Sequence, residues 1–140
     1  MAESFVSNEW LFKPLVCSAK WVRERIAAGD IFFGARREYR LVGAIEIAFS
    51  GSGADFTRLC VVPEARRRGI ATRLIAYAEE EAISRGAATI TSMTADELGI
   101  GLMFVNAGFS VTQREMVYAA EYAKRPFCRI RYSKRTVKSV

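Results

Sequence analysis

The sequence predicts a mixed α/β fold, and three observations support this prediction. An apolar run over residues 59–62 stops at Pro63, and a basic turn that contains Gly69 follows it. After this turn, apolar residues recur every four positions up to residue 82, which is the period of an amphipathic helix. Elsewhere, apolar stretches rich in β-branched residues are separated by polar or glycine-rich turns, as in the strands of a sheet.

The strand–turn–helix unit at residues 61–85 is the clearest element. The first turn of its helix is predicted at residues 67–71. The apolar stripe of the helix consists of Ile70, Leu74, Ala78 and Ala82, and three consecutive glutamates lie mostly off it. Gly86 is expected to end the helix, because glycine readily adopts the left-handed conformation of a C-terminal cap.

The segments before this unit are predicted to form one helix and three strands. A helix is predicted over residues 16–28, closing at Gly29. A strand begins at Ile31, a polar turn follows at residues 36–40, and a second strand covers residues 41–49. A loop at residues 50–53 then joins it to a third strand over residues 54–62.

The segments after the central helix continue the alternation of strands and helices. A strand is predicted over residues 88–93, a short helix over 95–106 and a strand over 109–119. In the last strand Cys128, Ile130 and Tyr132 alternate with arginines, so that one face is buried and the other wet. There is no internal repeat and no linker. Residues 1–140 are therefore expected to form a single domain, with residues 123–140 as a basic C-terminal strand and tail.

The net charge of +6 is concentrated at the C-terminal end. Residues 123–140 hold seven Lys/Arg and no acid, whereas the preceding residues are nearly balanced. Such a segment attracts nucleic acid or another anionic partner. The structural alternative is a charged terminal strand that deters pairing at the edge of the sheet.

Residue usage indicates a cytoplasmic protein. Three cysteines are far apart in the sequence, which favours reduced thiols. The absence of histidine excludes a histidine base and argues against a metal site. No apolar run approaches the ~20 residues that span a bilayer, and no secretion signal is evident. We therefore expect no metal and no membrane partner.

The start of the central helix has the properties of a phosphate site. The first amides of a helix lack intrahelical acceptors, and the helix dipole makes this end partly positive. Gly69 and Ala71 leave room for a ligand near the backbone, and four arginines lie nearby, namely Arg66, Arg67, Arg68 and Arg73. The alternative is that these arginines form only a solvated loop.

This segment resembles the GNAT (GCN5-related) N-acetyltransferase family. Arg66-x-x-Gly69-x-Ala71 matches the Gln/Arg-x-x-Gly-x-Gly/Ala signature of that family, and Gly108-Phe109 is similar to its terminal Gly-Phe. The resemblance covers roughly residues 30–120. It implies a GNAT-like fold, with a mixed, mostly antiparallel sheet that splays open beside the strand at residues 54–62, helices on its faces, and a shortened N-terminal region.

The resemblance also implies acetyl-CoA as co-substrate, wedged into the splayed sheet. A backbone amide near Val61 or Val62 would then steady the thioester carbonyl oxygen. The pantetheine arm would pair with the main chain of Cys60, Val61 and Val62. The pyrophosphate would rest on the turn and helix start, formed by Arg66, Arg67, Arg68, Gly69, Ile70, Ala71 and Thr72.

Two carboxylates are candidates for the base that takes the proton of the acceptor amine. Asp55 lies eleven residues before Arg66, where several family members carry a glutamate base. A four-residue loop at 50–53 places Ala48 opposite Asp55 and Glu46 opposite Thr57, so that the two carboxylates lie diagonally on one sheet face, roughly 7–8 Å apart. Such proximity would raise one pKa. The alternatives are that Asp55 binds its own turn and that Glu46 forms an ion pair with an arginine such as Arg58.

Three other residues bear on catalysis. Phe104 occupies the position that often carries a tyrosine acid in the family, so water, Tyr77 or Tyr118 would have to serve instead. Glu97 replaces a frequent asparagine. Strand alternation places Cys60 on the face opposite Asp55, as a structural thiol rather than a nucleophile.

We therefore predict an acyl-CoA-dependent N-acyltransferase that transfers an acetyl group to an amine by direct attack in a ternary complex. The shortened N-terminal region implies an open acceptor site, suited to a macromolecule or completed by a second subunit in a homodimer. Two alternatives stay open. One is a CoA-binding module with weak catalysis. The other is a nucleic-acid modifying or binding protein, like the phage Mom proteins.

Overall fold

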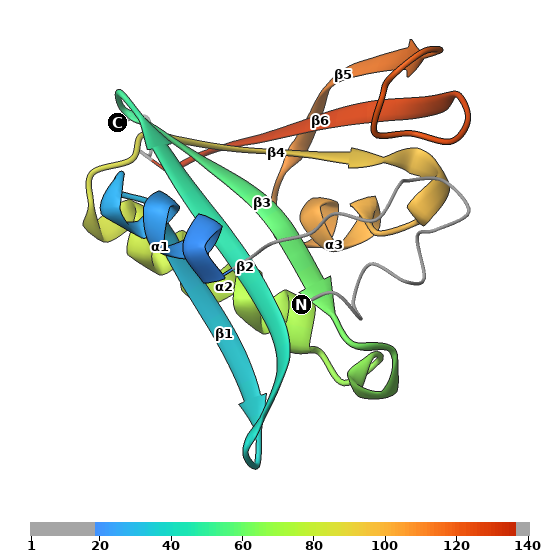
Figure 1. Ribbon diagram of the computed structural model, residues 1–140. Helices are drawn as coiled ribbons and strands as arrows, with labels where there is room; N and C mark the ends of the chain where they lie inside the picture. Colours follow the sequence, from blue (N-terminus) through green and yellow to red (C-terminus); the bar gives the residue numbers. More distant parts are fainter. Residues whose placement is uncertain (1–18, 137–140) are drawn as a thin grey trace.

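The computed structural model describes residues 19–136 as a six-stranded sheet with helices on both faces (Figure 1). The strand order is β1-β2-β3-β4-β6-β5, and all neighbouring strands are antiparallel except β3 and β4. The strands are β1 (Ile31–Arg37), β2 (Arg40–Ser50), β3 (Gly53–Val61), β4 (Thr89–Ala95), β5 (Ser110–Val117) and β6 (Phe127–Arg135). The helices are α1 (Ala19–Ala27), α2 (Ile70–Ser84) and α3 (Gly101–Asn106), with short 3-10 turns η2 (Pro63–Ala65) and η3 (Asp96–Leu98).

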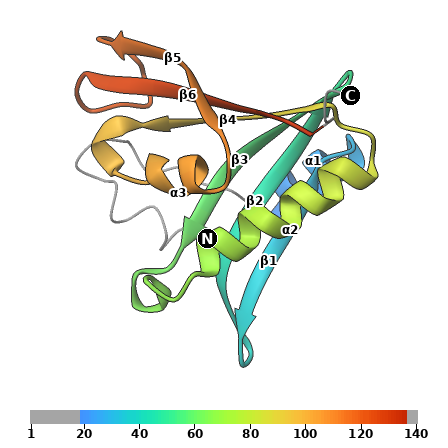
Figure 2. The ribbon, with the colours of Figure 1, turned by 180° about the vertical axis from the view of Figure 1, so that it is seen from behind.

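The main core lies between the sheet and α2. Figures 1 and 2 show α1 on one face of the sheet and α2 and α3 on the other. Three of the four residues of the predicted α2 stripe, Leu74, Ala78 and Ala82, are buried, and Ile70 is half-buried. The stripe packs on the inward residues of β2 and β3. The buried side chains on these three elements include Leu74, Ile75, Ala78, Ala82, Ile45, Ile47 and Phe56.

Strands β3 and β4 pair over only four residues. Their ladder runs from Gly53–Thr89 to Phe56–Ser92, and the strands then diverge (Figure 1). The Ser92 Oγ donates a 2.9 Å hydrogen bond to the Phe56 carbonyl at the last rung. The predicted splay of the sheet is therefore confirmed.

A β-bulge in β3 lies directly after this point. Glu46 pairs with Thr57 and Ala44 pairs with Cys60, so two residues of β3 stand opposite the single residue Ile45. One of the two, Arg58, has a φ of 52°. A bulge adds a residue, bends its strand and increases the local twist. We infer that the bulge turns β3 away from β4.

The hairpin register agrees with the prediction. Glu46 lies opposite Thr57, Ala48 opposite Asp55, and Phe49 opposite Ala54. The loop is tighter than predicted, because Ser50 pairs with Gly53.

The three predicted helices are present, with some boundaries that differ from the prediction. The helix α2 begins at Ile70 rather than at residue 67, because Gly69 has a φ of 76° and serves as the N-cap. Gly86 ends it as predicted, with a φ of 85°. The predicted helix at 95–106 is split into η3 and α3 by Gly99, whose φ is 70°. Of the first predicted helix, residues 19–27 are helical, and residues 16–18 lie outside the described residues.

The C-terminal basic segment is mostly an internal strand. β6 lies between β4 and β5, so the structural alternative of a charged strand at the sheet edge is wrong. Two of its cations have partners inside the fold: Arg129 pairs with Glu115, and Lys134 with Glu79. The order β4-β6-β5 requires contacts between distant segments, which periodicity alone does not reveal. Residues 137–140 of the predicted tail lie outside the described residues.

Candidate functional site

The larger of two neighbouring cavities lies where strands β3 and β4 have diverged. Its volume is about 760 Å³, and its walls come from the end of β3, the arginine loop, the start of α2, and η3 with α3. Most of the residues predicted to bind the cofactor meet in this cavity: Cys60, Val61, Arg66, Arg67, Gly69, Ile70, Ala71 and Thr72. Arg68 lies exposed in the same loop, and Val62 is buried.

The start of α2 presents free amide donors to this cavity. The first helical hydrogen bond runs from the Arg73 amide to the Gly69 carbonyl, and no side chain caps the helix. The amides of residues 70–72 therefore precede the helical ladder. A Cβ on Gly69 would have no heavy atom of the described chain within 4 Å, so the backbone is open to a ligand here. An anion fits this position by charge and by hydrogen bonding.

The end of β3 distinguishes Val61 from Val62. The Val62 amide donates a 2.9 Å hydrogen bond to the Val42 carbonyl and therefore points toward β2. Because successive amides of an extended strand point to opposite sides, the Val61 amide points toward the opening. The Arg66 Nε donates to the Val61 carbonyl at 2.9 Å, which anchors the arginine loop to the strand. Of the two amides named in the prediction, Val61 or Val62, the geometry thus favours Val61, and binding of the cofactor there stays a prediction.

A second cavity, of about 290 Å³, meets the first. The two cavities share Leu59, Leu98 and Ile100 as lining residues. The polar residues of the smaller cavity are Thr57, Arg58, Ser92, Thr94, Tyr122 and Arg129. Thr94, Tyr122 and Arg129 were not predicted as site residues. Thr94 enters the site because β4 has diverged from β3, whereas Arg129 and Tyr122 enter it because β6 lies beside β4. Local periodicity does not reveal the pairing of β6 with β4.

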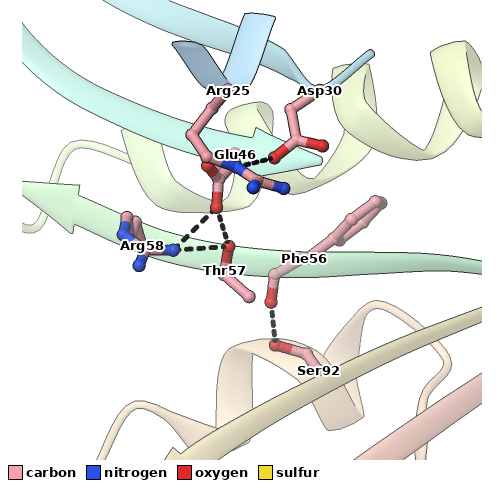
Figure 3. A network of polar contacts seen from close by, with 7 residues as sticks. All are labelled: Arg25, Asp30, Glu46, Phe56, Thr57, Arg58 and Ser92. Carbon is pink, nitrogen blue, oxygen red and sulfur yellow. Dashed lines mark hydrogen bonds and ion pairs between the residues drawn. The ribbon is translucent and has the colours of Figure 1, made fainter. Parts of the chain in front are cut away.

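Glu46 sits in a buried polar network beside the smaller cavity (Figure 3). It is 2% exposed, and its Oε1 accepts hydrogen bonds from Thr57 Oγ1 at 2.5 Å and from Arg58 Nη1 at 2.7 Å. The Arg58 guanidinium lies 4.4 Å from the centre of the Trp21 ring on α1. The ion pair with Arg58, one of the two sequence interpretations of Glu46, is thus present.

Three buried polar atoms in this region have no hydrogen-bond partner among the described residues. They are Glu46 Oε2, Arg58 Nε and Thr94 Oγ1. Buried polar atoms are nearly always bonded, so each of these three needs an explanation. Arg58 and Thr94 line the smaller cavity, which makes a bound molecule the natural partner.

Asp55 lies at the closed end of the splay and lines neither cavity. Its carboxylate accepts a 2.7 Å hydrogen bond from Thr91 Oγ1 on β4, rather than binding its own turn. Burial raises the pKa of Asp55, while the Thr91 hydrogen bond and the charge of Arg131 lower it. Glu46 is not among the causes of this shift, so the predicted coupling of the two carboxylates is not found.

The bulge changes the position of Cys60. Since Cys60 pairs with Ala44, two residues from Glu46 on β2, it shares a sheet face with Glu46 and Asp55. Strand alternation predicted the opposite face, because the extra residue at Arg58 was not visible in the sequence.

The other predicted positions make structural contacts or lie away from the cavities, and Phe104 also lines the smaller cavity. Phe104 is buried against Phe109 and Tyr132, with ring centroids 5.4 and 5.5 Å away. The carboxylate of Glu97 accepts the Cys128 amide at 2.9 and 3.0 Å and ties η3 to β6. Tyr77 and Tyr118 are exposed and line neither cavity.

A splayed sheet with an anion-binding helix start beside the opening is the architecture that the sequence resemblance implied. The family model for the acetyltransferase (GNAT) domain matches residues 7–120. The chain therefore belongs to the GNAT acetyltransferase family, whose general chemistry is acyl transfer. No curated protein matches the sequence. Among residues 19–136, no helix is long and apolar enough to cross a membrane.

Solved acetyltransferase structures share the fold. The ribosomal-protein-S18-alanine N-acetyltransferase from Escherichia coli has a TM-score of 0.76 at 13% identity, covering 94% of this chain and 84% of its own. The ribosomal-protein-alanine N-acetyltransferase from Brucella melitensis has a TM-score of 0.72 at 20% identity, covering 83% and 75%. An aminoglycoside 6'-N-acetyltransferase solved with coenzyme A has a TM-score of 0.68 at 22% identity, covering 85% and 79%.

The raised pKa of Asp55 makes stability depend on pH. A carboxyl group whose pKa is raised above its ordinary value of 3.8 binds its proton more tightly in the folded chain. Its contribution to stability is present below that value and is lost as the pH rises through the folded-state pKa. As the pH rises from about 4 to about 7, the wild type should therefore lose stability relative to Asp55→Asn. The free energies of unfolding of the two proteins, measured by urea denaturation, give this difference. A shift in favour of the wild type would contradict this.

Proposed function

We propose that this protein is an N-acetyltransferase that uses acetyl-CoA as the acetyl donor and an amine as the acceptor. The observation that carries the proposal is the meeting of two cavities at Leu59, Leu98 and Ile100, where β3 and β4 have parted. A donor in the larger cavity and an acceptor in the smaller one would touch at this point. Direct attack in a ternary complex then needs no covalent enzyme intermediate.

The larger cavity is suited to the donor along its whole length. The pyrophosphate would accept hydrogen bonds from the amides of residues 70–72, with the arginines of residues 66–68 supplying positive charge. The pantetheine arm would follow the open side of β3. The Val61 amide would donate to the thioester oxygen as it gains negative charge in the tetrahedral intermediate.

The smaller cavity offers a route for the proton of the acceptor amine. Thr57 lines this cavity, and its Oγ1 donates to Glu46 Oε1. Thr57 would take a proton from the amine while passing its own along this hydrogen bond to Glu46 Oε1, which leaves Glu46 as the protonated acid. Asp55 lies outside the cavities, so Glu46 is the better of the two predicted carboxylates.

Bond changes at the acetyl group complete the reaction. The amine nitrogen attacks the thioester carbon, and collapse of the intermediate breaks the C–S bond to release CoA thiolate. Phe104 cannot donate a proton to this thiolate. Water would supply the proton, because a thiolate is a tolerable leaving group.

Cofactor binding is tested by a matched pair of glycine variants. Gly69→Glu puts a negative side chain into the larger cavity, whereas Gly86→Glu adds the same side chain at the other end of α2. Both glycines have positive φ (76° and 85°) and free space, so both variants carry a similar backbone strain of about 1–2 kcal/mol. By calorimetry, we expect Gly69→Glu to bind CoA at least about tenfold more weakly, and Gly86→Glu to bind like the wild type. Equal affinities of the two variants, or a wild type that binds no CoA, would overturn the proposed function.

The proton route is tested by the pH profile of kcat. In Glu46→Gln and Thr57→Val, we expect kcat to fall by about a hundredfold or more and the pH profile of kcat to differ from that of the wild type. Asp55→Asn should keep kcat and profile close to those of the wild type. Glu46→Gln breaks a buried ion pair and could unfold the protein. Thr57→Val keeps that pair and is the decisive variant: a wild-type profile in it would exclude the route.

A further inference from the structure

The smaller cavity, called the acceptor cavity from here on, has two guanidinium groups in its lining. Arg58 enters it from β3 and Arg129 from β6. No acidic side chain is among the described residues that line it. The carboxylate partners of the two arginines, Glu46 and Glu115, lie outside the lining. The cavity wall therefore presents two guanidinium groups to whatever occupies it.

Both arginines lie on the same face of the sheet, on opposite sides of the gap. Arg58 contacts Glu46 and Trp21, which places it on the face covered by α1. Arg129 pairs with Ala95, two positions from Met93 and four from Thr91, the partner of Asp55. Since residues two apart in a strand share a face, Arg129 is on the face of Asp55 and Glu46.

Each guanidinium has donor capacity beyond its ion pair. Arg58 uses Nη1 for Glu46, and its buried Nε has no partner among the described residues. An arginine nitrogen can only donate, so the missing partner must be an acceptor. Arg129 uses Nε and Nη2 for Glu115. The hydrogen bond to Glu115 raises the pKa of Arg129, and the neighbouring Tyr122 adds to this effect, so Arg129 keeps its charge.

The remainder of the acceptor cavity defines the other parts of its ligand. Thr94 is 9% exposed, and its unpartnered hydroxyl lies on the opposite face of β4 from the two arginines, because it pairs with Ile130. Much of the remaining wall is apolar, formed by Phe56, Met93, Leu98, Phe104 and Phe127. A volume of about 290 Å³ is at the low end for ligand pockets.

We propose that the acceptor is an α-amino acid with an apolar side chain. Its carboxylate binds between Arg58 and Arg129, and its amine lies in the gap, where the Thr94 hydroxyl accepts a hydrogen bond from it. The carboxylate takes no part in bond making. Polycationic amines are disfavoured, because two arginines repel them. The inference rests on the proposed function and specifies its substrate class.

The test compares acceptors that share the phenethylamine skeleton and differ in the group at the carboxylate position. L-Phenylalanine, L-phenylalaninamide and phenethylamine carry a carboxylate, a carboxamide and neither, and spermidine serves as the polycation. With acetyl-CoA saturating, we expect kcat/KM for phenylalanine to exceed that of the other three by at least about tenfold. An alanine-led tripeptide with a free amino terminus serves as the macromolecular comparison.

Two variants separate the carboxylate site from the amine site. Arg129→Gln should lower kcat/KM for phenylalanine by about tenfold and leave phenethylamine unchanged, whereas Arg131→Gln on the same strand should change neither. Thr94→Val should lower both values about equally without lowering the melting temperature, because it removes a hydroxyl that has no partner among the described residues.

The outcomes distinguish this inference from the proposed function. If phenylalaninamide, phenethylamine, spermidine or the tripeptide is acetylated as well as phenylalanine, the inference is overturned and the proposed function stands. The inference is also overturned if Arg129→Gln behaves like Arg131→Gln, or if phenylalanine neither reacts nor binds to the CoA-loaded protein. Loss of CoA binding itself would overturn the proposed function.

Discussion

The conformation of one non-glycine residue underlies the site. Arg58 has a φ of 52°, a left-handed conformation that costs an ordinary L-residue about 1–2 kcal/mol. The buried ion pair with Glu46 and the stacking of the guanidinium on Trp21 hold its side chain in place. These contacts offset the backbone strain and fix the bulge that bends β3. Without the bend, β3 would continue beside β4, and the space of both cavities would close.

The fold compensates for the ladder that the bend removes. Ser92 bonds the Phe56 carbonyl at the last shared rung, and Val62 pairs with Val42 on the other side of β3. The part of β4 that has left β3 is supported by β6, which pairs with it along its whole length. Within residues 19–136, no strand pairs with the open side of β3 beyond Phe56, and the Val61 amide is part of that edge. The same bend therefore creates the donor cavity and exposes the amide proposed to act in it.

Local patterns in the sequence predicted the parts of the structure that local interactions determine. The stripe of α2, the stop at Gly86 and the register that places Glu46 opposite Thr57 follow from periodicity, glycine chemistry and loop length. The signature from Arg66 to Ala71 led to the larger cavity, since that wall is continuous in sequence. The bulge was missed because an arginine carries no signal for a positive φ. The shift of Cys60 to the other face followed from that omission.

The acceptor cavity depends on contacts between distant segments, so the sequence could not predict it. The sequence pattern predicted Arg129 on the solvent-exposed face of a terminal strand. Only the insertion of β6 between β4 and β5 brings Arg129 to the gap. Tyr122 reaches the cavity for the same reason, whereas Thr94 lines it because β4 has diverged from β3. In the sequence, the positive charge of residues 123–140 indicated an anionic partner. In the fold, Arg129 is paired and faces a cavity, and binding of nucleic acid stays an untested prediction.

The central claim is that acyl-CoA occupies the gap that the bulge opens between β3 and β4. The most direct measurement is a titration of ¹⁵N-labelled protein with acetyl-CoA, followed through the backbone amide shifts in NMR spectra. The largest shifts should fall on Val61, Gly69 and the amides of residues 70–72, while the β1–β2 hairpin tip and Gly86 stay unmoved. Saturable binding with its largest shifts elsewhere, or no shift at Val61 and Gly69, would contradict the claim.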